Sequence, residues 1–204
     1  MKVKICGIRT FEAAQAAVLA GADYLGFIFA EGKRHISPLD AGRIISKIDS
    51  SVKKIGVFMN QPYEEIVETY YLAGLDYVQL HGEETAEFAD SLPFPVIKAI
   101  SLNSEYNFSG VSGYPASYFL LDRPKSAAKE TLDWKRLTMS DFPLSELFLA
   151  GGLTPENVEE AIITVRPYAV DVSSGVETDG VKDIGKIRAF IRNAKRGSGE
   201  EIIK

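Results

Sequence analysis

Cysteine and histidine are scarce in this chain of 204 residues, which holds one cysteine and two histidines. A single cysteine excludes an intramolecular disulfide and any cysteine-based metal cluster. The two histidines, His35 and His81, are too sparse to supply the ligand spacing of a metal site. We therefore expect no metal site. The lone thiol also fits a reducing cytoplasm, which is the compartment we predict.

Long apolar runs and an excess of positive charge are missing as well. No stretch approaches the length of about 18 apolar residues that a membrane span needs, and the N-terminal residues do not resemble a signal peptide. The net charge of −5 provides no general basic surface for nucleic acid or an anionic membrane, although a local basic pocket for a small anion remains possible. We expect a small-molecule substrate, no nucleic-acid partner and no membrane partner.

Short β-rich runs alternate with longer amphipathic runs along the whole chain. Their nearly continuous hydrophobicity is typical of parallel strands that are buried on both faces. The eight runs are 3–6, 24–29, 54–59, 77–80, 96–100, 118–121, 147–150 and 169–172. Ser37-Pro38 and Thr154-Pro155 each offer an N-cap followed by an N1 proline for the helix that comes next.

Eight such units predict an α/β fold, a single compact (β/α)8 TIM barrel with short loops. The barrel domain should span residues 1–196, and residues 197–204 should form a flexible C-terminal tail. Residues 103–115 are rich in Ser, Gly and Asn, so the fifth helix should be short or irregular. A doubly wound open sheet is the alternative architecture.

Glycine and serine follow the last two predicted strands. In this barrel, the loops after strands seven and eight often bind phosphate through backbone N–H groups. The residues we assign to such a site are Gly151, Gly152, Ser173, Ser174 and Gly175. The alternative is that these residues only make tight turns.

Cys6 and Asp122 stand at the ends of the first and sixth predicted strands. Cys6 is either a small buried hydrophobe or a general base whose pKa has been brought near the working pH. Asp122 is either a structural residue, as a loop-capping carboxylate or an ion-pair partner of Arg123, or a catalytic acid. In an eight-stranded barrel these two strand ends face each other across the mouth, so one acid and one base would flank a small substrate.

Three further residues are candidates for substrate binding. Arg34 lies in a basic turn that is solvated by default, but if it points inward it can hold a carboxylate with two parallel hydrogen bonds. His81 directly follows the fourth predicted strand. Asp171 lies at the end of the eighth strand, where it either orients other groups or holds the turn.

Six segments of the chain resemble the signature segments of the phosphoribosylanthranilate isomerase family, in the family's order. They are KICGI (4–8), GADYLGFIF (21–29), VF (57–58), QLHGE (79–83), LAGGL (149–153) and DVSSGVE (171–177). One glycine turn would be weak evidence, because such turns occur in many barrels. Six segments in order, across residues 2 to 192, are specific.

The resemblance implies an enzyme of tryptophan biosynthesis, an isomerase that needs no metal or organic cofactor. It would convert N-(5-phosphoribosyl)anthranilate to 1-(o-carboxyphenylamino)-1-deoxyribulose 5-phosphate by an Amadori rearrangement. The matching motifs imply that Cys6 is the general base and Asp122 the general acid. They place Arg34 near the anthranilate carboxylate and the glycine loops at the phosphate. We expect a monomer or a homodimer.

The sequence departs from the family pattern in two places. Residues 126–134 contain no glycine where the family has a glycine-rich stretch, so the sixth loop should be stiffer or differently shaped. Residues 32–34 read Gly-Lys-Arg, where the family usually has Ser-Pro-Arg. Arg34 is therefore kept without the supporting proline that precedes it in the family.

Two other functions remain open. One is a parallel Amadori isomerase of histidine biosynthesis, which resembles two half-barrels with two catalytic aspartates and duplicated phosphate sites; Cys6 in the base position argues against it. The other is a non-catalytic barrel that binds a phosphorylated ligand. The altered sixth loop supports this alternative, whereas Cys6 and Asp122 oppose it.

Overall fold

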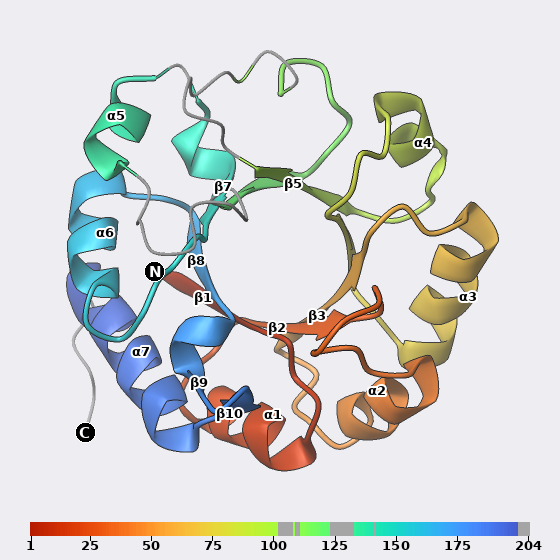
Figure 1. The fold of residues 1–204 in the computed structure, drawn as a ribbon, viewed down its shortest axis with the longest axis horizontal. Helices are drawn as coiled ribbons and strands as arrows, with labels where there is room; N and C mark the ends of the chain where they lie inside the picture. The colour runs from red at the N-terminus through yellow and green to blue at the C-terminus, as the bar shows by residue number, and fades with distance from the viewer. Residues whose placement is uncertain (102–107, 109–110, 123–132, 141, 200–204) are drawn as a thin grey trace.

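A closed barrel of eight parallel strands forms the centre of the computed structural model, which describes residues 1–101, 108, 111–122, 133–140 and 142–199 (Figure 1). Each strand is hydrogen-bonded to the next, and β8 pairs with β1 to close the ring. The strands are β1 (Lys2–Cys6), β2 (Tyr24–Ile28), β3 (Lys53–Phe58), β4 (Tyr77–Leu80), β5 (Val96–Ser101), β6 (Tyr118–Asp122), β7 (Leu147–Leu149) and β8 (Ala169–Val172). The predicted TIM barrel is confirmed, and the open sheet is excluded.

Helices cover the outside of the barrel (Figure 1). They are α1 (Phe11–Leu19), α2 (Pro38–Ile45), α3 (Tyr63–Ala73), α4 (Ala86–Ser91), α5 (Trp134–Thr138), α6 (Val158–Val165) and α7 (Ile184–Gly197). Between β5 and β6 the described residues form a turn at 111–113 and no helix. Residues 102–107 and 109–110 of that connection, and residues 123–132 after β6, which include most of the glycine-free stretch, lie outside the described residues.

The helix starts follow local sequence signals. Ser37 caps α2, accepting a hydrogen bond from the Asp40 N–H, and Pro38 is the first helical residue, as predicted. Thr154-Pro155 instead belongs to a turn, and α6 begins three residues later, after Asn157. The Asn157 side chain accepts a hydrogen bond from the Thr154 N–H, which stabilises this turn in place of a helical start.

Side chains alternate between two faces along each strand. On β1, Val3 and Ile5 are fully buried in the layer between the sheet and the helices. Lys4 and Cys6 therefore face the barrel interior, because successive strand residues point to opposite faces. The same alternation places Tyr24 and Ile55 in a separate apolar cluster inside the barrel.

Tyrosines close the N-terminal end of the barrel. Tyr24, Tyr77 and Tyr118 begin β2, β4 and β6, and Tyr168 precedes β8. The hydroxyls of Tyr24 and Tyr168 are 2.9 Å apart, and the ring of Tyr118 stacks on that of Tyr168 with centroids 4.6 Å apart. The hydrogen bond to Tyr168, together with burial, raises the pKa of Tyr118 to about 12. These tyrosine side chains therefore pack together and fill the N-terminal end of the barrel.

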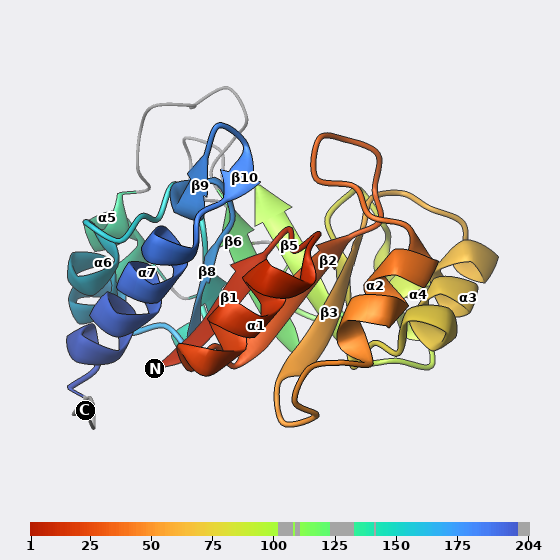
Figure 2. The ribbon, with the colours of Figure 1, turned by 90° about the horizontal axis from the view of Figure 1, so that it is seen from below.

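A short hairpin and the last helix follow β8. The 3-10 helix η2 (Ser174–Val176) leads into β9 (Glu177–Thr178), which pairs with β10 (Val181–Lys182). The hairpin lies at one end of the barrel, beyond the C-terminal end of β8 (Figure 2). Helix α7 includes Gly197, the first residue of the predicted tail, and residues 200–204 lie outside the described part of the chain.

Candidate active site

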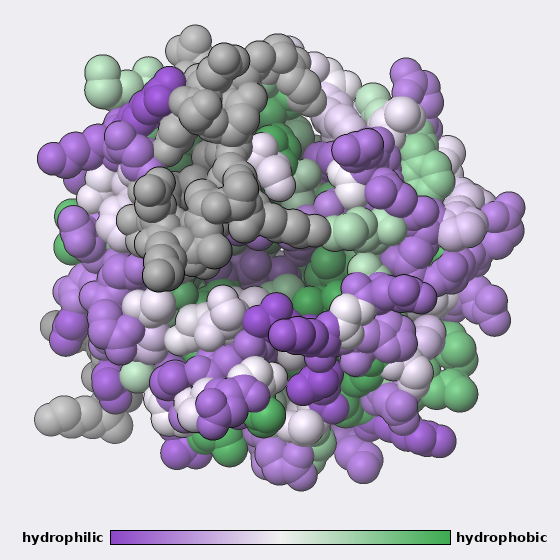
Figure 3. All heavy atoms as spheres, in the orientation of Figure 1, coloured by the Kyte–Doolittle hydropathy of each residue, from purple (hydrophilic) through white to green (hydrophobic). Residues whose placement is uncertain are grey.

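The C-terminal ends of the parallel strands meet at one end of the barrel, and this end carries the polar side chains that the sequence singles out. Cys6, Asp122 and Asp171 lie at or near the ends of β1, β6 and β8, while His81 and Ser173 directly follow β4 and β8. In the view along the barrel, hydrophilic and hydrophobic side chains are both visible around the centre of the ring (Figure 3). Barrel closure therefore brings together residues from both halves of the chain.

Cys6 is the last residue of β1, and its side chain is buried on the interior face of the barrel, with 6% of the residue's surface exposed. It pairs in register with Gly26 of β2, where an added Cβ would lie 2.8 Å from Cys6 Sγ. Glycine at this position leaves room for the thiol inside the barrel. Burial raises the pKa of the thiol, and the charge of Asp171 raises it further, whereas the ammonium groups of Lys4 and Lys182 lower it.

Lys4 is a buried cation that our sequence reasoning did not assign. It is fully buried, and its Nζ donates to Asp171 Oδ1 at 3.0 Å. Burial alone would lower the pKa of Lys4, but the charges and hydrogen bonds of Asp171 and Cys6 outweigh it and raise that pKa. The only sequence signal was a charged residue within an apolar strand, two positions before Cys6.

Asp122 lies beside His81 at the mouth. His81 Nε2 is 3.8 Å from Asp122 Oδ2, and the Gln79 side-chain amide is 3.0 Å from His81 Nδ1. Gln79 is almost fully buried, so it holds the imidazole from inside the barrel. The alternative partner considered for Asp122, Arg123, lies outside the described residues.

A lysine outside the barrel wall holds the loop that follows His81. Lys98 Nζ donates to the carbonyl of Gly82 at 2.7 Å and to Glu84 Oε2 at 2.8 Å. The Glu84 carboxylate also accepts hydrogen bonds from the N–H groups of Asn60 and Gly82. These contacts fix the backbone directly after His81, and the sequence reasoning missed them.

Arg34 reaches the mouth instead of pointing into solvent. Its Nε and Nη2 donate to the two carboxylate oxygens of Glu177, both at 2.7 Å. Its alkyl chain crosses Gly7, where an added Cβ would lie 2.9 Å from Arg34 Cδ. Gly7 also has a φ of 78°, a conformation that favours glycine. The structure therefore places Arg34 next to the end of β1, already bound to an acidic side chain of the hairpin.

The hairpin adds a second cation, Lys182, which the sequence reasoning also missed. Its Nζ donates to Glu177 Oε1 at 2.6 Å and to the Ser173 carbonyl at 2.9 Å. Burial alone would raise the pKa of Glu177, but hydrogen bonds from Arg34 and Lys182 outweigh it and lower that pKa to about 2. In the sequence, Glu177 appeared only as the last residue of the segment DVSSGVE. The strands β9 and β10 have two residues each, which is too short for a sequence pattern to predict them.

The loops after β7 and β8 touch each other. Gly151 and Gly152 have φ values of 86° and 81°, so both require a conformation that other residues rarely adopt. An added Cβ at Gly175 would lie 1.9 Å from the Leu153 carbonyl oxygen, a contact that only glycine permits. Asn157 Nδ2 donates to the Gly152 carbonyl at 3.1 Å and so orients that peptide. Ser173 and Ser174 sit beside this contact, at the start of η2.

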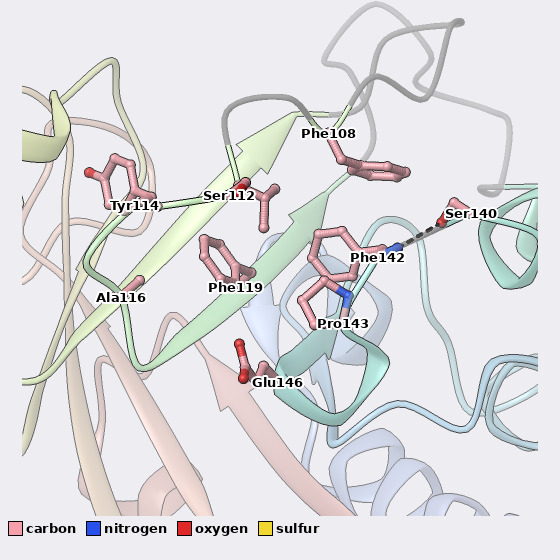
Figure 4. A pocket seen from close by; sticks show the side chains of 11 residues that line it. Phe108, Ser112, Tyr114, Ala116, Phe119, Ser140, Phe142, Pro143 and Glu146 are labelled. Carbon is pink, nitrogen blue, oxygen red and sulfur yellow. Dashed lines mark hydrogen bonds between the residues drawn. The ribbon is translucent and has the colours of Figure 1, made fainter.

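A further cavity lies outside the barrel wall. It has a volume of about 830 Å³ and lies between the connection that precedes β6 and the segment that precedes β7 (Figure 4). Phe108, Phe119 and Phe142 line it, together with Glu146 at one end. None of the predicted site residues lines this cavity.

The described residues offer no metal site and no membrane-spanning helix. Among them, no group of three or more His, Cys, Asp or Glu side chains is arranged to hold a metal ion. No helix in this part of the chain has the length and apolar character needed to cross a membrane.

Comparison with known proteins places this geometry in one family. The family model described as N-(5'phosphoribosyl)anthranilate (PRA) isomerase matches residues 3–193. The N-(5'-phosphoribosyl)anthranilate isomerase of Bacillus thuringiensis (strain Al Hakam) is 47% identical over 203 residues, which are 97% of this chain and 100% of the relative.

Solved structures agree. The phosphoribosyl anthranilate isomerase of Thermotoga maritima has a TM-score of 0.87 and 40% identity, covering 96% of this chain and 99% of the other. Another phosphoribosyl anthranilate isomerase, in complex with reduced 1-(o-carboxyphenylamino)-1-deoxyribulose 5-phosphate, has a TM-score of 0.85 and 42% identity over the same shares. The chain belongs to the N-(5'-phosphoribosyl)anthranilate isomerase family.

Proposed function

We propose that this chain converts N-(5-phosphoribosyl)anthranilate to 1-(o-carboxyphenylamino)-1-deoxyribulose 5-phosphate, with Cys6 as the general base and Asp122 as the general acid. This is the Amadori rearrangement of tryptophan biosynthesis. One observation carries the assignment of roles: a buried thiol and a carboxylate end β1 and β6 at the same mouth, and β7 and β8 separate them on the shorter way around the barrel. The relative that holds the reduced product supports the choice of substrate.

The chemistry requires one acid and one base. Asp122 donates a proton to the ribose ring oxygen, the bond from C1′ to that oxygen breaks, and a protonated Schiff base forms. The positive nitrogen acidifies C2′, so the thiolate of Cys6 removes the C2′ proton. The resulting enolamine then takes up a proton at C1′ while its C2′ hydroxyl loses a proton, which gives the ketone. In this proposal His81 contacts the reacting end of the substrate, and its support is the 3.8 Å distance between His81 Nε2 and Asp122 Oδ2.

Arg34 and the glycine loops hold the two ends of the substrate. Glu177 occupies the Nε and Nη2 side of the guanidinium, which leaves the Nη1 side for the anthranilate carboxylate. The phosphate binds the loops formed by Gly151, Gly152 and residues 173–175, because glycine backbone there approaches an anion closely. Lys182, hydrogen-bonded to Ser173, adds positive charge beside this loop.

Turnover of phosphoribosylanthranilate, followed by the loss of its fluorescence, tests this proposal with two variants. Cys6→Ser should lose most activity, since a hydroxyl is far too weakly acidic to serve as the base. Asp122→Asn should bind the reduced product almost normally and lose kcat by about a hundredfold or more, the scale for one general acid. Near-normal turnover in either variant contradicts that residue's role. A wild-type chain that binds the reduced product without turnover would instead be a non-catalytic barrel.

The oligomeric state, the cellular compartment and the domain boundaries remain predictions. We infer a monomer or a homodimer; a relative from Thermotoga maritima is described as dimeric. The single cysteine supports a cytoplasmic location. The division into a barrel over residues 1–196 and a tail over residues 197–204 can be tested by removing the tail and measuring thermal stability and turnover.

A further inference from the structure

Lys4 and Cys6 share the interior face of β1, because they are two residues apart on one strand. Both side chains lie against the same point of β2. An added Cβ at Gly26 would be 2.8 Å from Cys6 Sγ and 3.2 Å from Lys4 Cε. The aliphatic chain of Lys4 and the thiol of Cys6 therefore lie close together inside the barrel, both against Gly26.

The ammonium of Lys4 is removed from water, and among the described residues one carboxylate forms an ion pair with it. Lys4 is fully buried, and Asp171, its ion-pair partner at 3.0 Å, is also buried. A buried ion pair contributes little net stability, because the loss of hydration offsets the attraction. Stability alone therefore does not explain why a lysine is buried at position 4. A nearby group that becomes negatively charged does explain it.

We propose that Lys4 is a positioning residue for the reaction: its ammonium, held by Asp171, stabilises the thiolate form of Cys6. This inference rests on the proposed function, in which Cys6 is the base. A thiolate inside a closed barrel lacks water to stabilise its negative charge. A fixed ammonium beside the thiolate provides that stabilisation instead.

The charged groups that face Cys6 come from several elements. Lys4 lies on the same strand, Asp171 on β8 and Lys182 on β10, and Arg34 comes from the loop after β2. Burial is the largest influence and raises the pKa of the thiol, and Lys4 is the largest influence that lowers it. Removing the charge of Lys4 should therefore move the pKa of Cys6 upward.

The chain allows a direct measurement, since it contains one cysteine. The ultraviolet absorbance of the thiolate is titrated in the wild-type protein and in Lys4→Met, and the same titration of Cys6→Ser is subtracted to remove the tyrosine signal. An opposite charge at close range shifts a pKa by about one unit or more. The thiolate fraction of Lys4→Met should thus fall about tenfold at any pH well below its pKa.

A matched control shows whether the effect is specific to Lys4, and a second variant keeps the test valid if Lys4→Met folds poorly. Lys54 on β3 forms an ion pair with Asp76 at 2.9 Å near the opposite end of the barrel, so Lys54→Met should leave the thiol titration unchanged. Lys4→Gln keeps an N–H donor for Asp171 without the charge, and it should shift the thiol titration upward even if Lys4→Met folds poorly. In both Lys4 variants, the acidic limb of the kcat/KM profile should move upward with the thiol.

The direction of the shift in the Cys6 pKa distinguishes the loss of the Lys4 charge from a loss of packing. A loosened barrel would admit water and lower the pKa of the thiol, so an upward shift requires the loss of the ammonium. An unchanged or lowered thiol pKa in Lys4→Gln and Lys4→Met overturns the inference. A Cys6→Ser variant that keeps its turnover overturns the role of Cys6 in the proposed function, yet the thiol titration still reports separately on Lys4.

Discussion

Gly175 lies where the loops after β7 and β8 touch, and replacing it with alanine tests whether this contact shapes the proposed phosphate site. The added methyl group would lie 1.9 Å from the Leu153 carbonyl oxygen and 3.0 Å from the Leu153 carbonyl carbon. Both neighbours are backbone atoms, so no rotation of a side chain relieves the overlap. The two loops must separate.

The size of the movement follows from the contact. A separation of about 1.5 Å or more is needed before the methyl group reaches an ordinary contact distance. Inserting a methyl group into a packed site costs about 1–3 kcal/mol of stability. A displacement of about 1 Å at a positioning group lowers the rate by as much as about a hundredfold. Because Ser173, Ser174 and Gly175 are proposed to bind the phosphate, we expect weaker substrate binding together with a lower Tm.

Steady-state kinetics with phosphoribosylanthranilate and inhibition by inorganic phosphate measure the effect. In Gly175→Ala, KM and the inhibition constant of phosphate should rise together by about tenfold or more. Gly185→Ala is the matched control, because its Cβ meets only the Asp183 carboxylate, at 3.2 Å, in the first turn of α7. Alanine there should leave KM unchanged and keep or slightly raise the Tm, since glycine is a poor helix former.

The two readouts separate the possible outcomes. A lower Tm with an unchanged KM and unchanged phosphate inhibition would show that this contact is structural only, and the phosphate would have to bind elsewhere. A variant with both wild-type stability and wild-type kinetics would contradict the geometry itself.

Three other variants test separate parts of the site. Arg34→Lys should raise KM several-fold with little change in kcat, because an ammonium cannot hold Glu177 and a substrate carboxylate with paired hydrogen bonds; an unchanged KM would remove Arg34 from the substrate site. Gly26→Ala should lower kcat/KM by about tenfold or more, measured beside thermal unfolding, because its methyl group would lie 2.8 Å from Cys6 Sγ. The pKa of Glu177 is lowered from 4.5 to about 2, so the stability from its ion pairs is fully present above pH 4.5 and is lost as the pH falls through about 2. Glu177→Gln should flatten that loss in urea unfolding series, and an equally steep acid loss in the variant would show that these pairs contribute little.

Local sequence patterns were sufficient to predict the order of the strands and the barrel. Apolar runs of a few residues recur between amphipathic segments, and the strands observed fall on all eight predicted runs. The rule that chemistry lies at the C-terminal ends of barrel strands then selected Cys6, His81 and Asp122. Strand alternation is a local property, so it also sets which of these side chains face the interior.

The start of α6 shows where local signals were too weak. Thr154-Pro155 has the form of a helix start, yet Asn157 accepts a hydrogen bond from the Thr154 N–H and the helix begins at Val158. A turn stabilised by a side chain three residues away competes with the cap, and the sequence pattern does not rank the two.

Only the tertiary structure determined which charges meet. Lys4 and Asp171 are 167 residues apart, and Arg34 and Glu177 are 143 residues apart. The pairing of β1 with β8 closes the ring and places Lys4 in register with Asp171, and the hairpin folds Glu177 back over the mouth. Charge pairing acts through space and depends on register and closure, which no local pattern encodes. The sequence by itself therefore identified the strand ends and the candidate residues on them, whereas the charged partners that surround Cys6 and Arg34 were decided when the barrel closed.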